Sequence, residues 1–287
     1  MKYMAEDKGT LYLCATPIGN LGDLSARCLE IFREVDIIAA EDTRRTLQLL
    51  NHFGITKALT SYHEHNKKTK GEYIVKLLLE GKNVAQVSDA GTPAISDPGE
   101  DLVKLCIENG INVTSVPGPV AGITALILSG LPTGRYAFEG FLSVNKRNRF
   151  EHLEKIKNDT HTLIFYEAPH KLRSTLEDMK KTFGENRRIA IARELTKFHE
   201  EIIRTTLGGA TQYYEEKTPR GEYVLVVEGA DETAQAEKEE VFWENMSVIE
   251  HVDKYISEGM TQKDAIKMAA TDRLVPKREI YNEYHKN

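Results

Sequence analysis

Short apolar runs alternate with segments of helical periodicity through the first 130 residues. Thr10 to Ala15 has the pattern of a strand, and residues 24–34 have the apolar spacing of a helix. Similar patterns recur further along the chain. The further strands are expected at 37–40, at 84–87 and from Val113, and the further helices at 44–53, 71–80 and 101–109 and in a last segment that ends near Leu128. Such alternation predicts a mostly parallel sheet with helices on both faces.

The pattern changes after Pro132 and predicts a second domain of the α+β kind. Its strands are expected at 136–141, 162–166, 188–192, 200–206 and 223–228, and its helices at 169–183 and 210–215. An acidic, Ala-rich stretch at 230–240 is typical of a linker. The predicted organisation is therefore an N-terminal α/β domain at 1–132, a second domain at 133–230, and a linker with a small helical tail at 231–287.

The tail carries two helix-start signals. Thr261 and Asp264 resemble a capping box, and Pro276 suits the first turn of another helix. Two short helices in this order fit either a helix-turn-helix or a small packing appendage.

Three loops rich in glycine and proline, around Pro17, Asp89 and Pro117, each follow a predicted strand directly. In a parallel sheet the carboxyl ends of the strands share one edge, where ligands bind. The sequence therefore predicts one cleft at that edge.

Charge, cysteine content and hydropathy limit the classes of protein. With 38 Lys and Arg against 44 Asp and Glu, the net charge of −6 excludes nucleic-acid binding through overall positive charge, so any RNA contact needs a local patch. Three cysteines without C-x-x-C spacing fit neither a disulfide framework nor a structural zinc site and favour a reducing cytoplasm. Glu6, Asp7 and Lys8 argue against a signal peptide. The uncharged run 109–134 contains Pro117 and Pro119, so a buried strand, turn and helix is expected there, with no membrane association.

The common nucleotide fingerprints are absent. The chain has no G-x-x-x-x-G-K-[ST] and no G-x-G-x-x-G between a strand and a helix, which disfavours a P-loop ATPase, a kinase or an ordinary dehydrogenase. The loop from Ser88 to Gly99 has the composition of a preformed recognition surface, because glycine lets the backbone approach a ligand and proline limits the entropy lost on binding. The alternative is a pair of tight turns that cap a helix.

Five motifs in order resemble the rRNA ribose methyltransferases of the tetrapyrrole methylase superfamily. They are Ala15 to Leu21, Glu41 to Arg44, Ser88 to Gly99, Tyr166 to His170 and Ala192 to Lys197. The resemblance implies a homodimer of two-domain subunits, with S-adenosylmethionine bound between the domains. It also implies that the acceptor is the ribose 2′-hydroxyl of a cytidine in the decoding region of 16S rRNA, in the small ribosomal subunit. The cofactor-binding residues expected from it are Pro17, Ser88, Asp89, Ala90, Gly91, Thr92, Ile95, Ala121, Ala168, Leu195 and Gly221.

Methyl transfer from a sulfonium needs in-line placement of the acceptor more than it needs a metal, so no metal site is expected. His63 and His65 lack a third partner and are not taken as ligands. A carboxylate or a neutral lysine would help to remove the hydroxyl proton. Two groups are candidates, Glu41 and Asp42 with Arg44, and Glu194 with Lys197; helix-capping acids and a structural ion pair are the respective alternatives.

Phosphate contacts are expected from cations near these motifs. They are Arg45, Lys146, Arg147, Arg149, Lys171 and Arg193. Tyr62, Phe141 and Tyr166 are candidates for stacking an unpaired base, with core packing as the alternative. The tail is a further hypothetical contact with rRNA or ribosomal protein.

Two competing functions stay open at this stage. One keeps the fold and the methyl donor but takes a porphyrin-like acceptor. The other is a non-catalytic RNA-binding module that retains a degenerate donor cleft.

Overall fold

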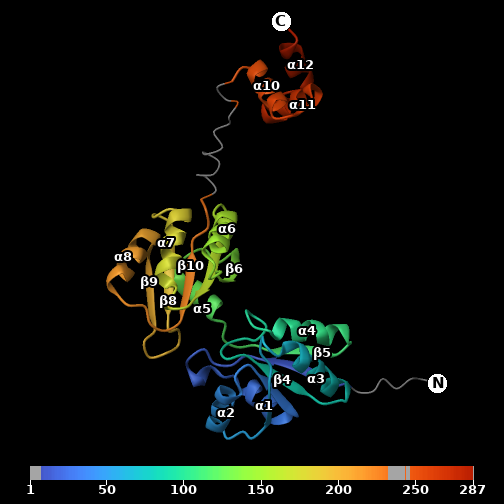
Figure 1. The fold of residues 1–287 in the computed structure, drawn as a ribbon, viewed down its shortest axis with the longest axis vertical. Helices are drawn as coiled ribbons and strands as arrows, with labels where there is room; N and C mark the ends of the chain where they lie inside the picture. The colour runs from blue at the N-terminus through green and yellow to red at the C-terminus, as the bar shows by residue number, and fades with distance from the viewer. Residues whose placement is uncertain (1–7, 232–242, 244–245, 287) are drawn as a thin grey trace, which may run out of the picture. The chain divides into compact units, whose positions relative to one another are not determined.

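The computed structural model describes residues 8–231, 243 and 246–286 (Figure 1). The chain forms two compact units, Met1–Gly229 and Ala230–Asn287, and each is described by itself. Most of the predicted linker at 230–240 lies outside the described residues.

The first sheet of the larger unit has five parallel strands in the order β3-β2-β4-β1-β5. Its strands are β1 (Thr10–Cys14), β2 (Ile37–Ala40), β3 (Ala58–Ser61), β4 (Val84–Val87) and β5 (Asn112–Val116). The predicted parallel sheet is confirmed. The edge strand β3 was missed, because its four residues are partly polar and only Thr60 is buried.

Helices cover both faces of this sheet, as predicted. They are α1 (Ala26–Glu34), α2 (Thr43–His52), α3 (Lys67–Leu79) and α4 (Gly99–Glu108), and a short 3₁₀ turn, η1 (Leu21–Asp23), precedes α1. Phe32 of α1 and Leu50 of α2 pack with Ile38 on one face, whereas Ile74 of α3 and Leu102 of α4 pack in a second core with Ala39. Neighbouring residues of β2 thus point into opposite cores, as the pleat of a strand requires.

Helix α3 begins four residues before the predicted start at Gly71. A Cβ atom on Gly71 would lie 2.9 Å from Leu105 Cδ1, so this glycine permits close packing between α3 and α4 and does not start the helix.

The second sheet has the order β6-β7-β10-β8-β9, in which β6 and β7 are parallel and the other pairs antiparallel. Its strands are β6 (Tyr136–Phe141), β7 (Thr162–Glu167), β8 (Arg188–Arg193), β9 (Glu201–Thr206) and β10 (Tyr223–Val227). The helices that pack on it are α5 (Ala121–Ser129), α6 (Lys146–Ile156), α7 (Leu172–Phe183) and α8 (Leu207–Glu216). Helix α6 was not predicted, because only Arg149 and Leu153 of its side chains are buried and its apolar pattern is weak.

Helix α5 follows the last strand of the first sheet but packs on the second. Ala125 and Leu126 share a core with Ile164, Ala190 and Val224 of β7, β8 and β10. The uncharged run 109–134 therefore forms a strand, a turn and a buried helix, as expected. Among the residues that the structure describes, no helix has the length and apolar character needed to cross a membrane.

The smaller unit contains α10 (Val248–Ser257), α11 (Gln262–Asp272) and α12 (Lys277–Tyr284) around a small apolar core. Thr261 caps α11 and Pro276 precedes α12, as predicted. Both expected helices are therefore present, but a third helix, α10, was missed; it begins at a capping box that Ser247 and Glu250 form.

Candidate functional site

The three Gly/Pro-rich loops converge at the carboxyl edge of the first sheet. They follow β1, β4 and β5, which are neighbours in the sheet. The backbones of Thr16 and Gly91 exchange two hydrogen bonds of 3.0 Å, and Thr92 Oγ1 donates to the carbonyl of Pro119 at 3.0 Å. The predicted meeting of these loops is confirmed.

A cavity of about 460 Å³ lies between these loops and the second sheet, within the range of small-molecule sites. Loops after β1, β2, β4 and β5 form one side. Residues of β6, β7, β8 and β10, the loops after β7 and β8, and the residue before β10 form the other. The lining residues are Ile18, Glu41, Ser88, Asp89, Ala90, Gly91, Thr92, Ile95, Ser96, Asp97, Val120, Ala121, Phe141, Tyr166, Glu167, Ala168, Pro169, Ala192, Leu195, Glu222, Tyr223 and Val224.

All the charged side chains of this lining are acidic. Five lining side chains are carboxylates, and none of the described residues in the lining is Lys, Arg or His. Asp97 Oδ2 is buried without a hydrogen-bond partner. Burial raises the pKa of this carboxyl, although hydrogen bonds from the backbone of Gly99 and Ala94 and from the side chain of Gln86 oppose the shift. A buried acceptor without a partner favours a ligand that carries a positive charge or a hydrogen-bond donor.

The loop from Ala94 to Gly99 is wrapped around the Asp97 carboxylate. Asp97 Oδ1 accepts from Ala94 N at 3.0 Å and from Gly99 N at 2.7 Å. Ala94 and Ser96 have φ values of 66° and 61°, which L-residues rarely adopt. Strain of this kind persists where surrounding contacts fix the backbone, and it is common at ligand sites.

Glu41 and Asp42 follow β2 at the same edge but have different surroundings. Glu41 lines the cavity, and burial, followed by the charge of Asp89, raises the pKa of its carboxyl. Asp42 is the N-cap of α2, where its carboxylate accepts from the backbone of Arg44 at 2.8 Å and of Arg45 at 3.4 Å. The helix-capping alternative thus describes Asp42, whereas the carboxyl of Glu41 caps no helix and lines the cavity.

Asp89 is held from two directions. Its Oδ1 accepts from the backbone N–H of Asp42 at 3.0 Å, and its Oδ2 accepts from Arg45 Nη1 at 3.2 Å. These bonds tie the loop after β4 to the start of α2 and fix the carboxylate in the cavity wall.

The second charged group lies just behind the cavity. Lys197 Nζ donates to Glu194 Oε1 at 2.9 Å and to Glu222 Oε2 at 2.8 Å, and only Glu222 of the three lines the cavity. Desolvation lowers the pKa of Lys197, but the two carboxylates outweigh it, so the net shift is upward. These two ion pairs therefore favour the charged ammonium form of Lys197 over the neutral amine.

This ion-paired group also joins the two sheets. A Cβ atom on Gly19 would lie 2.5 Å from Lys197 Cγ, and Asn20 N donates to Thr196 Oγ1 at 3.0 Å. The loop after β1 thus touches the loop after β8 directly.

The structure brings most of the predicted cofactor residues together. Nine of them line the cavity, namely Ser88, Asp89, Ala90, Gly91, Thr92, Ile95, Ala121, Ala168 and Leu195. Pro17 and Gly221 lie next to the lining residues Ile18 and Glu222. The predictions missed the lining residues Asp97, Glu167 and Glu222 as site residues, although Asp97 and Glu167 belong to motifs that the sequence already marked.

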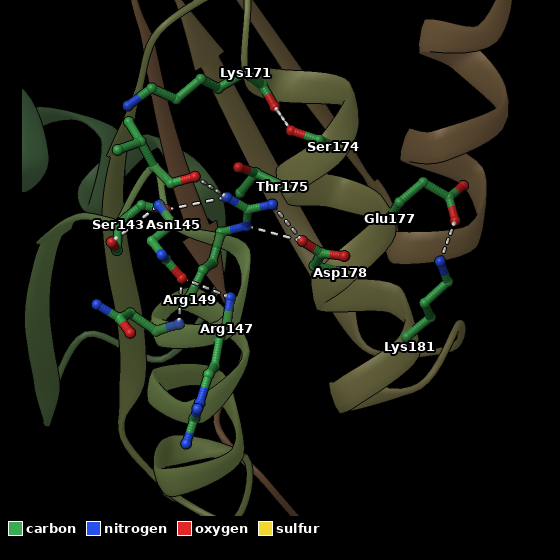
Figure 2. Close-up of polar contacts among 12 residues, drawn as sticks. Ser143, Asn145, Arg147, Arg149, Lys171, Ser174, Thr175, Glu177, Asp178 and Lys181 are labelled. Atoms are coloured by element: carbon green, nitrogen blue, oxygen red, sulfur yellow. Dashed lines mark hydrogen bonds and ion pairs between the residues drawn. The ribbon is translucent and has the colours of Figure 1, made fainter.

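Arg149 is a correction to the predicted RNA-contacting residues. Its side chain is 9% exposed, and Nε and Nη2 contact Asp178 Oδ2 at 2.8 and 2.7 Å (Figure 2). Its Nη1 donates to the carbonyls of Ser143 and Val144 at 3.0 and 3.4 Å. Because these bonds occupy a buried guanidinium, Arg149 cannot reach a phosphate.

The other predicted contacts differ in how freely their side chains extend. Arg147 is exposed and pairs with Glu151, and Lys146 is exposed at the start of α6. Arg193 is engaged with the carbonyl of Arg220 and with Glu201. Tyr62 is 1% exposed and donates to the carbonyl of Pro98, so the core alternative is correct for this residue.

No group of His, Cys, Asp and Glu within the described part of the chain has an arrangement that could hold a metal ion. His63 Nδ1 is buried without a hydrogen-bond partner, and its Nε2 lies 3.1 Å from the side-chain amide of Asn66.

Comparison with known proteins agrees with this geometry. The family model of the tetrapyrrole (corrin/porphyrin) methylases matches residues 10–211. The chain is 54% identical over 280 residues to ribosomal RNA small subunit methyltransferase I of Halalkalibacterium halodurans, covering 98% of this chain and 96% of that protein. It is 48% identical to the protein of that name from Bacillus subtilis, covering 97% and 95%.

Among solved structures, uroporphyrin-III C-methyltransferase from Thermus thermophilus, complexed with S-adenosyl homocysteine, has the same fold. The TM-score is 0.54 at 15% identity, and the match covers 79% of this chain and all of that one. The residues that the family model matches include the whole first sheet, strands β6 to β9 of the second sheet and every lining residue up to Leu195, whereas β10 lies beyond them. This chain therefore belongs to the tetrapyrrole methylase family.

Proposed function

We propose that the protein is an S-adenosylmethionine-dependent methyltransferase that methylates small-subunit ribosomal RNA. The observation that carries the proposal is the 54% identity, over almost the whole chain, to a protein named ribosomal RNA small subunit methyltransferase I. The finer part of the proposal, the ribose 2′-hydroxyl of a cytidine in the decoding region of 16S rRNA, rests on the motif resemblance in the sequence.

The cavity suits a sulfonium compound. Its lining is acidic and free of Lys, Arg and His, which disfavours phosphate-bearing nucleotides and favours a cation. The buried Asp97 Oδ2 lacks a partner, which a donor group on the cofactor would satisfy. The donor would be held by the loop from Ser88 to Asp97 and by Ala121, Ala168 and Leu195 on the facing walls. When bound, the cofactor supplies the methyl group.

The acceptor hydroxyl loses a proton as the methyl arrives, and Glu41 is the candidate base. It lines the cavity, and its carboxyl is not used to cap a helix. Burial and the charge of Asp89 raise its pKa, which brings the group closer to the range where a base is effective. Lys197, held as an ammonium between Glu194 and Glu222, fixes Glu222 in the cavity wall.

RNA would approach over surface cations. Lys146, Arg147 and Lys171, with Arg44 and Arg45 at the start of α2, remain the candidates for phosphate contacts. Arg193 would affect RNA binding only indirectly, because its guanidinium already bonds the carbonyl of Arg220 and the carboxylate of Glu201. We propose the cytoplasm as the compartment of the protein, because its ribosomal substrate is found there.

We also propose that the protein is a homodimer. Large apolar side chains are exposed on α5 and on the edge strand β6, among them Ile123, Ile127, Tyr136 and Phe138. Such groups are typical of a covered surface. Sedimentation analysis would detect the dimer, and a monomer at all concentrations would contradict this part of the proposal.

The decisive experiment offers tritium-labelled S-adenosylmethionine with small ribosomal subunits, naked 16S rRNA and a tetrapyrrole precursor in parallel. Label in the RNA, mapped to one ribose, is the expected result. Label in the tetrapyrrole alone would mean that the acceptor is a tetrapyrrole and not RNA. Calorimetry with the cofactor tests the remaining alternative, because a non-catalytic RNA-binding module should release no binding heat.

A further inference from the structure

Phe141, the last residue of β6, is a large apolar side chain left facing solvent at the cavity. Its side chain is 56% exposed and lines the cavity. Its ring contacts Tyr166 edge to face, with the centroids 5.5 Å apart, and Tyr166 also lines the cavity. An exposed aromatic ring beside a ligand cavity offers a flat apolar face to the ligand.

The direction of this ring is set by a β-bulge. The register between β6 and β7 shifts between Phe138 and Gly140, and Gly140 has a φ of 63°. Residues three apart would face opposite sides of a regular strand, yet Phe138 and Phe141 both contact the ring of Tyr166. The extra residue therefore turns Phe141 toward the cavity, which is a common use of a bulge.

The backbone after Phe141 is held firmly. Leu142 is buried in the core of the second sheet, and Arg149 grips the next two carbonyls, those of Ser143 and Val144. Asp178 of α7 fixes the Arg149 guanidinium in turn (Figure 2). A ring on a rigid backbone loses little entropy when a ligand packs on it.

Phe141 and the candidate base, Glu41, line the same cavity. A Cβ atom on Gly140 would lie 3.4 Å from Ser96 Oγ, so the bulge touches the loop after β4. Ser96 of that loop also lines the cavity, as does Glu41. The ring of Phe141 and the carboxyl of Glu41 thus border one cavity, and the loop after β4 contacts the bulge that carries Phe141.

We propose that Phe141 stacks on the base of the nucleotide whose ribose is methylated, with Arg149 and Asp178 as positioning residues that hold its backbone. This inference rests on the proposed function. Every nucleobase has a π-face that can stack on an aromatic side chain, and single-stranded RNA is commonly bound this way. A base held on Phe141 would keep its ribose at the cavity that Glu41 lines.

The test compares Phe141→Leu with Phe141→Tyr in the full-length protein, using small ribosomal subunits and labelled S-adenosylmethionine. Leucine keeps an apolar side chain but loses the π-face, so kcat/KM for the particles should fall by about 10-fold. Tyrosine keeps the ring and should stay within about 2-fold of the wild type. The cofactor Kd, measured by calorimetry, should be unchanged in both variants.

Phe150→Leu is the matched control. Phe150 is 50% exposed on α6 and is absent from the cavity lining, so kcat/KM should stay at the wild-type value. Wild-type activity in Phe141→Leu, or an equal loss in Phe141→Leu and Phe150→Leu, would overturn the proposal. If the wild-type protein itself transfers no label to RNA, the proposed function fails and the base platform fails with it.

Arg149→Lys tests the positioning role. Lysine keeps a positive charge near Asp178 but cannot bond that carboxylate and both carbonyls as the guanidinium fork does. If Arg149 acts through Phe141, this change should lower kcat/KM in the wild-type background and add little in the Phe141→Leu background. Equal losses in both backgrounds would assign Arg149 to general stability and contradict the positioning role.

Discussion

Replacing Gly91 offers a direct test of how the cofactor loop is built. Gly91 has a φ of 84°, and its N–H and carbonyl both bond Thr16 at 3.0 Å. An L-residue in a left-handed conformation costs about 1–2 kcal/mol. A Cβ atom would also lie 3.3 Å from Ile18 Cγ2 and 3.4 Å from the carbonyl of Pro119, so it presses on both neighbouring loops.

Gly91 and Ile18 both line the cavity. The loop can therefore relieve this strain only by a shift of the cavity wall. Because each 1.4 kcal/mol is a factor of ten in an equilibrium constant, Gly91→Ala should weaken S-adenosylmethionine binding by about 10-fold. Gly91→Val, with a branched side chain, should weaken it by about 100-fold. Calorimetry measures both constants.

Gly54→Ala is the control for backbone strain alone. Gly54 has a φ of 64°, and a Cβ atom there would meet nothing within 4 Å. The variant should lose about 4 °C in Tm but bind the cofactor as the wild type does. If Gly91→Ala also bound the cofactor normally, with only such a loss in Tm, the reasoning about the loop would be refuted.

Three further predictions concern the base, the ion pair and the tail. Glu41 must be ionised to accept a proton, and burial and Asp89 raise its pKa; kcat should therefore rise with pH through a pKa above that of an ordinary glutamate. Glu41→Gln should remove this rise of kcat with pH and lower kcat by about 100-fold without changing the cofactor Kd. An unchanged pH profile of kcat in this variant would exclude Glu41 as the base. Lys197→Ala should lower turnover more than cofactor affinity, because Lys197 lies outside the lining but fixes Glu222 within it; an equal loss of both would remove this division of roles. Deleting residues 231–287 should leave cofactor binding intact, because every lining residue belongs to the larger unit, and should reduce methylation of small subunits; unchanged methylation would end the proposed RNA role of the tail.

The local pattern was enough to predict the order of most elements. Strands β1, β2 and β4 are short, apolar and followed by loops of glycine, proline or acidic residues. The apolar run and the turn-forming residues after it therefore predict the same strand end. The pattern failed at β3 and α6, where few side chains are buried and tertiary contacts supply the stability. The local pattern also predicted that a helix starts at Gly71, whereas this glycine permits the close packing of α3 on α4.

The sequence determined by itself which loops form the cofactor edge, because the carboxyl ends of parallel strands must meet and each loop carries its own bends. Only the tertiary structure decided which charged groups act there. Glu41 and Asp42 are neighbours in the chain, yet one faces the cavity and the other caps a helix. Arg149 and Arg147 are two residues apart on α6, yet one is buried against Asp178 and the other is exposed. The sequence fixes the charge of a side chain, but the exposure and the partners of that side chain depend on elements that are distant along the chain.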